Sequence, residues 1–199
     1  MRTLIVQEFM TLDGVMQAPG GAEEDSSGGF QHGGWAAPYF AENEAVLAAV
    51  MRAWMQPMDI LLGRKTFEIW APYWPAHDAL WPGINKVAKY VLSRTLAHSD
   101  WQNTVFLQQL EDVRKIKAGR GGAIKVHGSA QLVQALLAHD LADELQLMIF
   151  PLLLGQGKRL FAANAVPAAY ALKDHAVTAS GVIFAHYVCG GAVEMGHLG

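Results

Sequence analysis

The stretch Asp59-Ile60-Leu61-Leu62-Gly63-Arg64-Lys65-Thr66-Phe67-Glu68-Ile69 passes from a short apolar segment through one glycine into a helical pattern. A short apolar run bounded by turn residues predicts a buried strand, so 59–62 is expected to be a strand that feeds a helix. The same form recurs where a strand over 124–127 is followed by Gly128-Ser129-Ala130 and a helix over 131–139. Two such units predict parallel strands, because a helix carries the chain back between them.

The rest of the chain extends this alternation. Strands are predicted over 4–9, 89–92, 105–107 and 145–153, helices over 41–56 and 110–117, and an antiparallel pair over 171–177 and 182–189. This order predicts a three-layer α/β fold in one domain over 1–199. Its central sheet is expected to be mostly parallel, with helices on both faces and a C-terminal antiparallel hairpin.

Residues 17–35 are rich in glycine and polar side chains, a composition that favours an open loop over a regular element. We expect this segment to be a mobile flap. It follows directly on the first strand and the turn Thr11-Leu12-Asp13-Gly14.

Composition excludes several classes of protein. With 52% hydrophobic and 17% charged residues the chain has enough apolar surface to fold. A net charge of −3 without a Lys/Arg cluster argues against nucleic acid and anionic membranes as partners. Cys189 is the only cysteine, so we expect no disulfide, no metal site and a reducing cytoplasmic location. Neither a signal peptide nor a membrane helix is expected, since the longest apolar run, 145–154, is far shorter than about 20 residues.

The two glycine turns are suited to bind phosphate. At a helix start the unpaired backbone N–H groups and the helix dipole favour an anion, and Arg64, Lys65 and the hydroxyls of Thr66 and Ser129 add donors. The alternative is that any strand-to-helix turn needs a small residue and a capping hydroxyl. Neither turn matches a dinucleotide or P-loop fingerprint, so spacing alone names no cofactor.

Five motifs in register resemble a known family. They are Thr11-Leu12-Asp13-Gly14-Val15, Gly63-Arg64-Lys65-Thr66-Phe67-Glu68, Val91-Leu92-Ser93-Arg94-Thr95, Val126-His127-Gly128-Ser129-Ala130-Gln131-Leu132-Val133 and Pro151-Leu152-Leu153-Leu154-Gly155-Gln156-Gly157-Lys158-Arg159-Leu160-Phe161. Over residues 3–188 the chain resembles dihydrofolate reductases, and more closely the branch with the reductase domain of bacterial riboflavin biosynthesis.

The resemblance implies an NADPH-dependent reductase that transfers a hydride to a small planar heterocycle, such as a pyrimidine or a pterin. It implies that the cofactor phosphates lie at Gly63, Arg64, Lys65 and Thr66, and that the adenosine ribose and its extra phosphate lie at Ser93 and Arg94. The pyrophosphate is implied at Gly128, Ser129, Ala130, Gln131 and Leu132. The nicotinamide is implied to be covered by Leu12, Asp13, Gly14 and Val15. Among these residues Asp13 is the candidate catalytic group, because it could orient the substrate or the nicotinamide amide; an Asp before Gly is also ordinary turn chemistry.

Two departures limit what the resemblance implies. Folate-reducing members carry an acid in the first long helix, whereas here that place falls near Leu47, and Glu42 and Glu44 lie about a turn earlier. The riboflavin-pathway reductase is usually fused to a zinc deaminase, and this chain lacks the Cys and His signature of that domain. The substrate therefore stays open, and proton delivery from water is expected.

Other residues carry two interpretations each. His127 could contact the cofactor or be structural, and His32 could be an acid or a solvated loop residue. The tryptophans Trp54, Trp70, Trp74 and Trp81 could include a stacking wall, although most are expected in the core. Lys158 and Arg159 could meet a substrate phosphate but are expected to form a turn, and Cys189 is expected to be buried.

Two alternative functions remain on the same fold. One is a non-catalytic nucleotide-binding or sensing module, and the other is a hydrolase or transferase of nucleotide-like substrates, which the absence of paired acids disfavours. The high apolar fraction and the hydrophobic final hairpin favour a homodimer.

Overall fold

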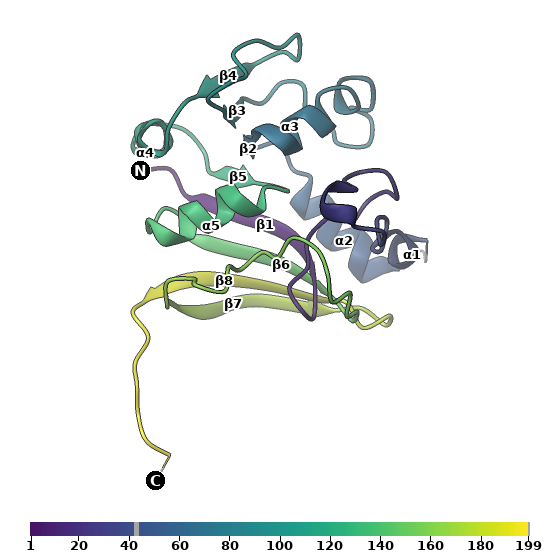
Figure 1. Cartoon of the computed structure of the whole chain (residues 1–199), viewed down its shortest axis with the longest axis vertical. Helices are drawn as coiled ribbons and strands as arrows, with labels where there is room; N and C mark the ends of the chain where they lie inside the picture. Colours follow the sequence, from purple (N-terminus) through teal and green to yellow (C-terminus); the bar gives the residue numbers. More distant parts are fainter. Residues whose placement is uncertain (42–43, 199) are drawn as a thin grey trace.

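Both strand-turn-helix units lie in the middle of one sheet. The computed structural model describes residues 1–41 and 44–198, and within them eight strands form a sheet in the order β4-β3-β2-β5-β1-β6-β8-β7 (Figure 1). In chain order the strands are β1 (Leu4–Thr11), β2 (Asp59–Gly63), β3 (Lys89–Leu92), β4 (Thr104–Leu107), β5 (Ile124–Val126), β6 (Glu144–Phe150), β7 (Ala169–Val177) and β8 (Ile183–Gly191). The pairs from β4 to β6 are parallel, whereas β8 runs antiparallel to both β6 and β7. The predicted fold class is confirmed.

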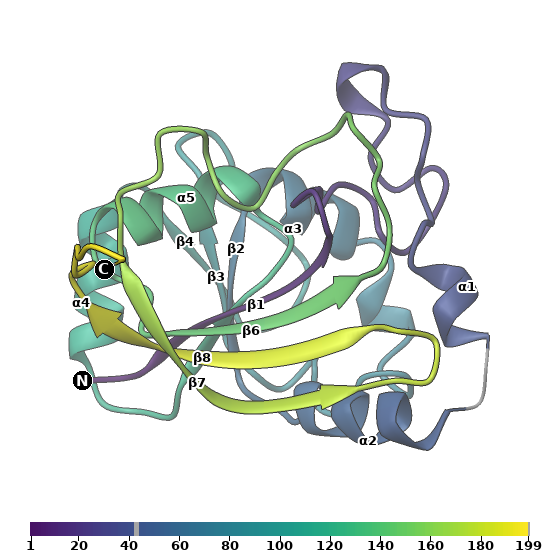
Figure 2. The same ribbon diagram turned by 90° about the horizontal axis from the view of Figure 1, so that it is seen from below.

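Helices cover both faces of this sheet. They are α1 (Ala37–Phe40), α2 (Ala45–Trp54), α3 (Arg64–Trp70), α4 (Leu110–Ala118) and α5 (Ala130–Ala138), with 3₁₀ turns at Ser27–Gly29 and Trp74–Ala76. Alternate residues of a strand face opposite sides, so Leu61 packs with α4 and α5, while Ile60 and Leu62 pack beneath α3. The core on the α2 side holds Leu47 and the aromatic ring of Phe150. Figure 2 shows the long strands β6, β8 and β7 side by side.

Two predicted boundaries were wrong, one at the end of a strand and one at the start of a helix. The strand predicted over 145–153 ends at Phe150, because Pro151 has no N–H to continue the ladder. The helix predicted from 41 begins at Ala45, and the short helix α1 precedes it. Leu47 is buried in the core, Glu44 accepts the N–H of Ala179, and Glu42 lies outside the described residues.

Residues 17–35 do not form the open flap that their composition predicted. The segment is irregular apart from the turn at Ser27–Gly29, yet Phe30 and Trp35 are buried in the core. The indole N–H of Trp35 donates to the carbonyl of Gln17 at 2.7 Å. Two buried aromatic rings therefore fasten a loop whose glycines and polar residues suggested mobility.

Cys189 is exposed, which corrects the expectation of a buried thiol. It lies in the last part of β8, where both faces of the strand are open. No helix in the described part of the chain is long and apolar enough to cross a membrane.

Candidate functional site

A cleft of about 1330 Å³ follows the carboxyl ends of β3, β2, β5 and β1. Ligands in open α/β sheets gather at this edge, because the loops there are free to diverge. The cleft brings together eleven of the predicted cofactor residues: Gly63, Arg64, Lys65, Thr66, Ser93, Arg94, Gly128, Ser129, Ala130, Gln131 and Leu132. Motifs up to about seventy positions apart in the chain thus line one concave surface.

The turns after β2 and β5 are fastened to each other by hydroxyl groups. The backbone N–H of Gly63 donates to Ser129 Oγ at 2.8 Å, and Thr66 Oγ1 donates to the carbonyl of Gly128 at 2.9 Å. The two hydroxyl oxygens lie 2.7 Å apart, and since the Thr66 proton is used, the Ser129 hydroxyl is the donor between them. Both protons are therefore committed within the protein, and the hydroxyls of Thr66 and Ser129 fix the turns instead of offering free donors to a phosphate.

Gly128 is required where these turns meet. Its φ of +65° is unfavourable for residues with a side chain, and a Cβ there would lie 2.7 Å from Thr66 Cγ2. Beyond Gly128 and Ser129 the N-terminus of α5 lines the cleft, so backbone N–H groups of this nine-residue helix are the donors that remain for an anion.

Positive charge gathers at the β2 and β3 side of the cleft. Arg64 pairs with Glu68 at 2.7 Å on the exposed surface, while Lys65 and Arg94 are also exposed. Ser93 is buried, and its hydroxyl accepts the N–H of Leu96 at 2.8 Å. Ser93 thus shapes the turn that presents the Arg94 guanidinium.

The segment Leu12 to Val15 does not line the cleft with the other predicted residues. Asp13 Oδ1 accepts the hydroxyl of Thr11 at 2.5 Å, and Oδ2 accepts the N–H of Gly155 at 2.8 Å. Burial raises the pKa of Asp13, but these bonds outweigh it, and the net effect is a pKa below the ordinary value. Val15 is fully buried in the core. A catalytic role for Asp13 stays a prediction, while its contacts hold the chain after β1 against the 154–155 loop.

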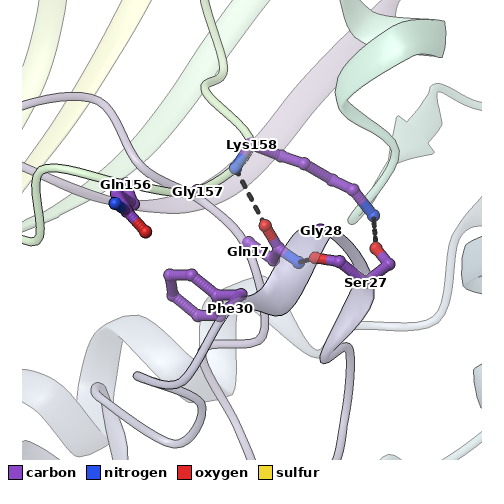
Figure 3. A pocket seen from close by; sticks show the side chains of 7 residues that line it. All are labelled: Gln17, Ser27, Gly28, Phe30, Gln156, Gly157 and Lys158. Atoms are coloured by element: carbon purple, nitrogen blue, oxygen red, sulfur yellow. Dashed lines mark hydrogen bonds between the residues drawn. The ribbon is translucent and has the colours of Figure 1, made fainter.

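Lys158 and Arg159 tie loops together, as expected for a turn. Lys158 Nζ lies 2.5 Å from Asp25 Oδ2, and its backbone N–H donates to Gln17 Oε1 at 3.0 Å. Figure 3 shows Gln17, Ser27 and Lys158 joined around a small pocket of about 240 Å³ beside the cleft. Arg159 donates to the carbonyl of Gly155 at 3.0 Å. His32 is exposed and is absent from the residues that line the cleft.

Aromatic side chains also line the cleft. The four tryptophans singled out from the sequence, Trp54, Trp70, Trp74 and Trp81, all line it. His127 packs between two of these rings, with centroids 5.5 Å from Trp70 and 5.4 Å from Trp81, and its Nε2 has no hydrogen-bond partner. Burial, assisted by the charge of Lys125, lowers the pKa of His127 to about 3, so the ring is neutral.

Glu8 lines the cleft and was missed in the sequence. The residue is 5% exposed, and its Oε1 has no hydrogen-bond partner among the described residues. Burial raises the pKa of Glu8 to about 8, an effect opposed by the backbone N–H groups of Gly128 and Ser129 and increased by the charge of Glu24. The available signal was an acid inside a mostly apolar strand, where an unpaired charge is costly.

Comparisons with known proteins agree with this architecture. YyaP of Bacillus subtilis (strain 168), named an uncharacterized protein, is 38% identical over 110 residues, which cover 51% of this chain and 58% of YyaP. The match thus spans less than two thirds of that relative. A protein of Shewanella sp. PV-4 whose name assigns it to riboflavin biosynthesis superposes with a TM-score of 0.62 at 19% identity, covering 94% of this chain and 98% of that one.

Dihydrofolate reductase of Enterococcus faecalis, solved with NADP(H) and the compound RAB-propyl, superposes with a TM-score of 0.60 at 11% identity. The superposition covers 94% of this chain and 96% of that enzyme, which establishes a common fold. The family model for the RibD C-terminal domain matches residues 2–184. The chain is therefore a member of the RibD C-terminal domain family, and it shares its fold with dihydrofolate reductase.

Proposed function

We propose that this protein is an NADPH-dependent reductase that transfers a hydride to a small planar heterocycle, such as a pyrimidine or a pterin-like ring. The observation that carries this proposal is that one cleft is lined by the start of α5, by the cationic residues Arg64, Lys65 and Arg94, and by tryptophan side chains. Membership in a reductase-type family supports it.

The donor set of the cleft fits a dinucleotide phosphate. The N-terminus of α5 offers backbone N–H groups, and Gly128 allows the close approach to Thr66 that sets the turn before this helix. Arg94 is free of ion pairs in the described part of the chain, and its planar guanidinium suits the extra phosphate that distinguishes NADPH from NADH. A bound NADPH would supply the hydride.

The aromatic side chains of the cleft fit a flat, uncharged ring. Trp54 and Phe9 lie 5.9 Å apart between their ring centroids, and Trp70 and Trp81 lie 5.6 Å apart. Faces of this kind bind planar ligands by stacking and exclude water from them. With His127 neutral beside them, these rings favour a heterocycle over a charged aliphatic substrate.

The test combines binding and turnover. Purified protein is titrated with NADPH and NADH while tryptophan emission is followed, and NADPH oxidation is then measured with a panel of pterins, pyrimidines and quinonoid compounds. We expect NADPH to bind more tightly than NADH and to be oxidised with at least one acceptor. Binding without oxidation by any acceptor supports the non-catalytic nucleotide-binding alternative, and the absence of NADPH binding refutes the proposal.

We further propose that the protein forms a homodimer through the β7 and β8 hairpin. Leu172, Val177 and Ile183 expose apolar surface on these strands. Light scattering at micromolar concentration is expected to give twice the mass of the chain, and a monomer mass would contradict this. A cytoplasmic location stays a prediction.

A further inference from the structure

Glu8 lines the cleft on β1, the strand next to the three whose turns carry the residues suited to phosphate. The carboxyl ends of β3, β2, β5 and β1 follow one another along the sheet, and the residues suited to phosphate come after the first three. A dinucleotide whose adenosine phosphate lies at Arg94 and whose pyrophosphate lies at Gly128 must extend towards β1. The reactive end of the cofactor is therefore expected beside Gln7, Glu8 and Phe9, which line the cleft there.

In the described part of the chain, no ion pair contains the carboxyl group of Glu8. Along β1 it shares a face with Val6, on the side of α5, where Gly128 and Ser129 contribute only backbone groups. The loop after β1 contributes Glu24, a second carboxylate, which accepts the N–H of Gly20 at 2.7 Å.

Lys125 and the neutral His127, on the paired strand and its end, belong to the other face of the sheet. Lys125 of β5 donates to the carbonyl of Trp54 on α2, and His127 packs on the tryptophans of the α3 side. The lysine at the cleft rim, Lys158, is paired with Asp25. Among the described residues, the charge that acts on Glu8 is the negative one of Glu24, so burial favours the neutral acid form of Glu8.

We propose that Glu8 is the acid that protonates the substrate during reduction. The proposal rests on the reductase function proposed above, and it replaces the expectation that water delivers the proton. Glu8 gives its proton to the nitrogen of a C=N bond while the carbon of that bond receives the hydride that NADPH supplies. The substrate gains two hydrogen atoms, NADPH becomes NADP⁺, and the Glu8 carboxylate takes up a proton from solvent.

Cofactor phosphates next to Gly128 reinforce this role. An ionised Glu8 lies against the backbone of Gly128 and Ser129, so negative phosphates bound at the adjacent start of α5 repel it. Dinucleotide binding therefore keeps Glu8 protonated, so that the acid is loaded before the substrate reacts. Binding should take up protons near pH 8, where about half of the free protein carries an ionised Glu8.

The first arm of the test measures this proton uptake without turnover. Calorimetric titration with NADP⁺ at pH 8, in two buffers of different ionisation heat, is expected to show up to about half a proton taken up per chain. The uptake should disappear in Glu8→Gln and persist in Glu111→Gln, a control on the exposed surface of α4. Uptake that is zero in the unaltered protein, or equal in Glu8→Gln, overturns the proposal even if the variant is poorly folded.

The second arm measures turnover with an acceptor that the unaltered protein reduces. We expect Glu8→Gln to lower kcat about 100-fold or more with a KM for NADPH within about threefold, because the acid acts on the reaction and not on the cofactor. Glu8→Asp should recover part of the rate. An unchanged kcat in Glu8→Gln refutes the role of Glu8 as proton donor and leaves the proposed reductase function intact. Failure of the unaltered protein to bind or oxidise NADPH refutes the reductase function and, with it, this role of Glu8.

Discussion

Replacing Glu8 by Gln should change how the stability of the protein depends on pH. Burial raises the pKa of Glu8 from its ordinary value of 4.5 to about 8 in the folded chain. Between these two values the unfolded chain loses the proton that the folded chain keeps, so the free energy of unfolding falls as pH rises. Each unit of pKa difference corresponds to about 1.4 kcal/mol. The free energy of unfolding therefore falls by about 5 kcal/mol as the pH rises from below the pKa of Glu8 in the unfolded chain to above its pKa in the folded chain.

Gln has nearly the shape of protonated Glu and cannot ionise, so the variant should lack this loss. Urea unfolding of both proteins at pH 5.5, 6.5 and 7.5 measures the difference directly. From pH 5.5 to 7.5, we expect the free energy of unfolding of Glu8→Gln to rise by about 2 to 3 kcal/mol relative to that of the unaltered protein. Groups such as Glu24 titrate in both proteins and largely cancel. If the two stabilities stay parallel across the range, Glu8 ionises normally, and the argument that it is an uncompensated buried acid is refuted.

Three further predictions concern the phosphate side of the cleft. Ser129→Ala leaves the partly buried N–H of Gly63 without its acceptor and should lower the free energy of unfolding, measured in urea, by about 1–3 kcal/mol. Gly128→Ala places a Cβ 2.7 Å from the methyl carbon of Thr66 at a φ of +65°, so it should lower the free energy of unfolding by at least about 1 kcal/mol. Gly122→Ala, where a Cβ meets open space, should change the free energy of unfolding by no more than about 0.5 kcal/mol. Equal effects of the two substitutions would contradict the close approach of Gly128 to Thr66. In fluorescence titrations, Arg94→Gln should weaken NADPH binding about 10-fold or more and leave NADH binding nearly unchanged. The control Arg120→Gln, on the exposed turn before β5, should change the affinity for neither cofactor. Equal losses of affinity for both cofactors in Arg94→Gln would show that Arg94 does not bind the extra phosphate.

The sequence alone determined the elements and most of their order. Apolar runs such as 59–62 and 89–92 are local signals, and the structure forms strands there because a run of this kind has to be buried. The glycine turns were also visible, since a small residue between strand and helix is a local requirement. Eleven predicted residues consequently line one cleft, including Arg64, Arg94 and Ser129.

The tertiary structure decided what those residues do. The hydroxyls of Thr66 and Ser129 were expected to bind phosphate, but residues more than sixty positions apart use their protons on each other. Asp13 was expected at the nicotinamide, yet its carboxylate is bound by N–H groups some 140 residues away. A local sequence pattern does not indicate which distant group will form a hydrogen bond with a given side chain.

Glu8 shows the same division most clearly. The sequence displays an acid within a strand, which is compatible with an exposed position on a sheet edge. Only the packing of α5, the 17–35 loop and the turn at Gly128 around the middle of the sheet removes water from that carboxyl group. The energy of a charge depends on what surrounds it in space, and the order of residues along the chain does not specify those surroundings.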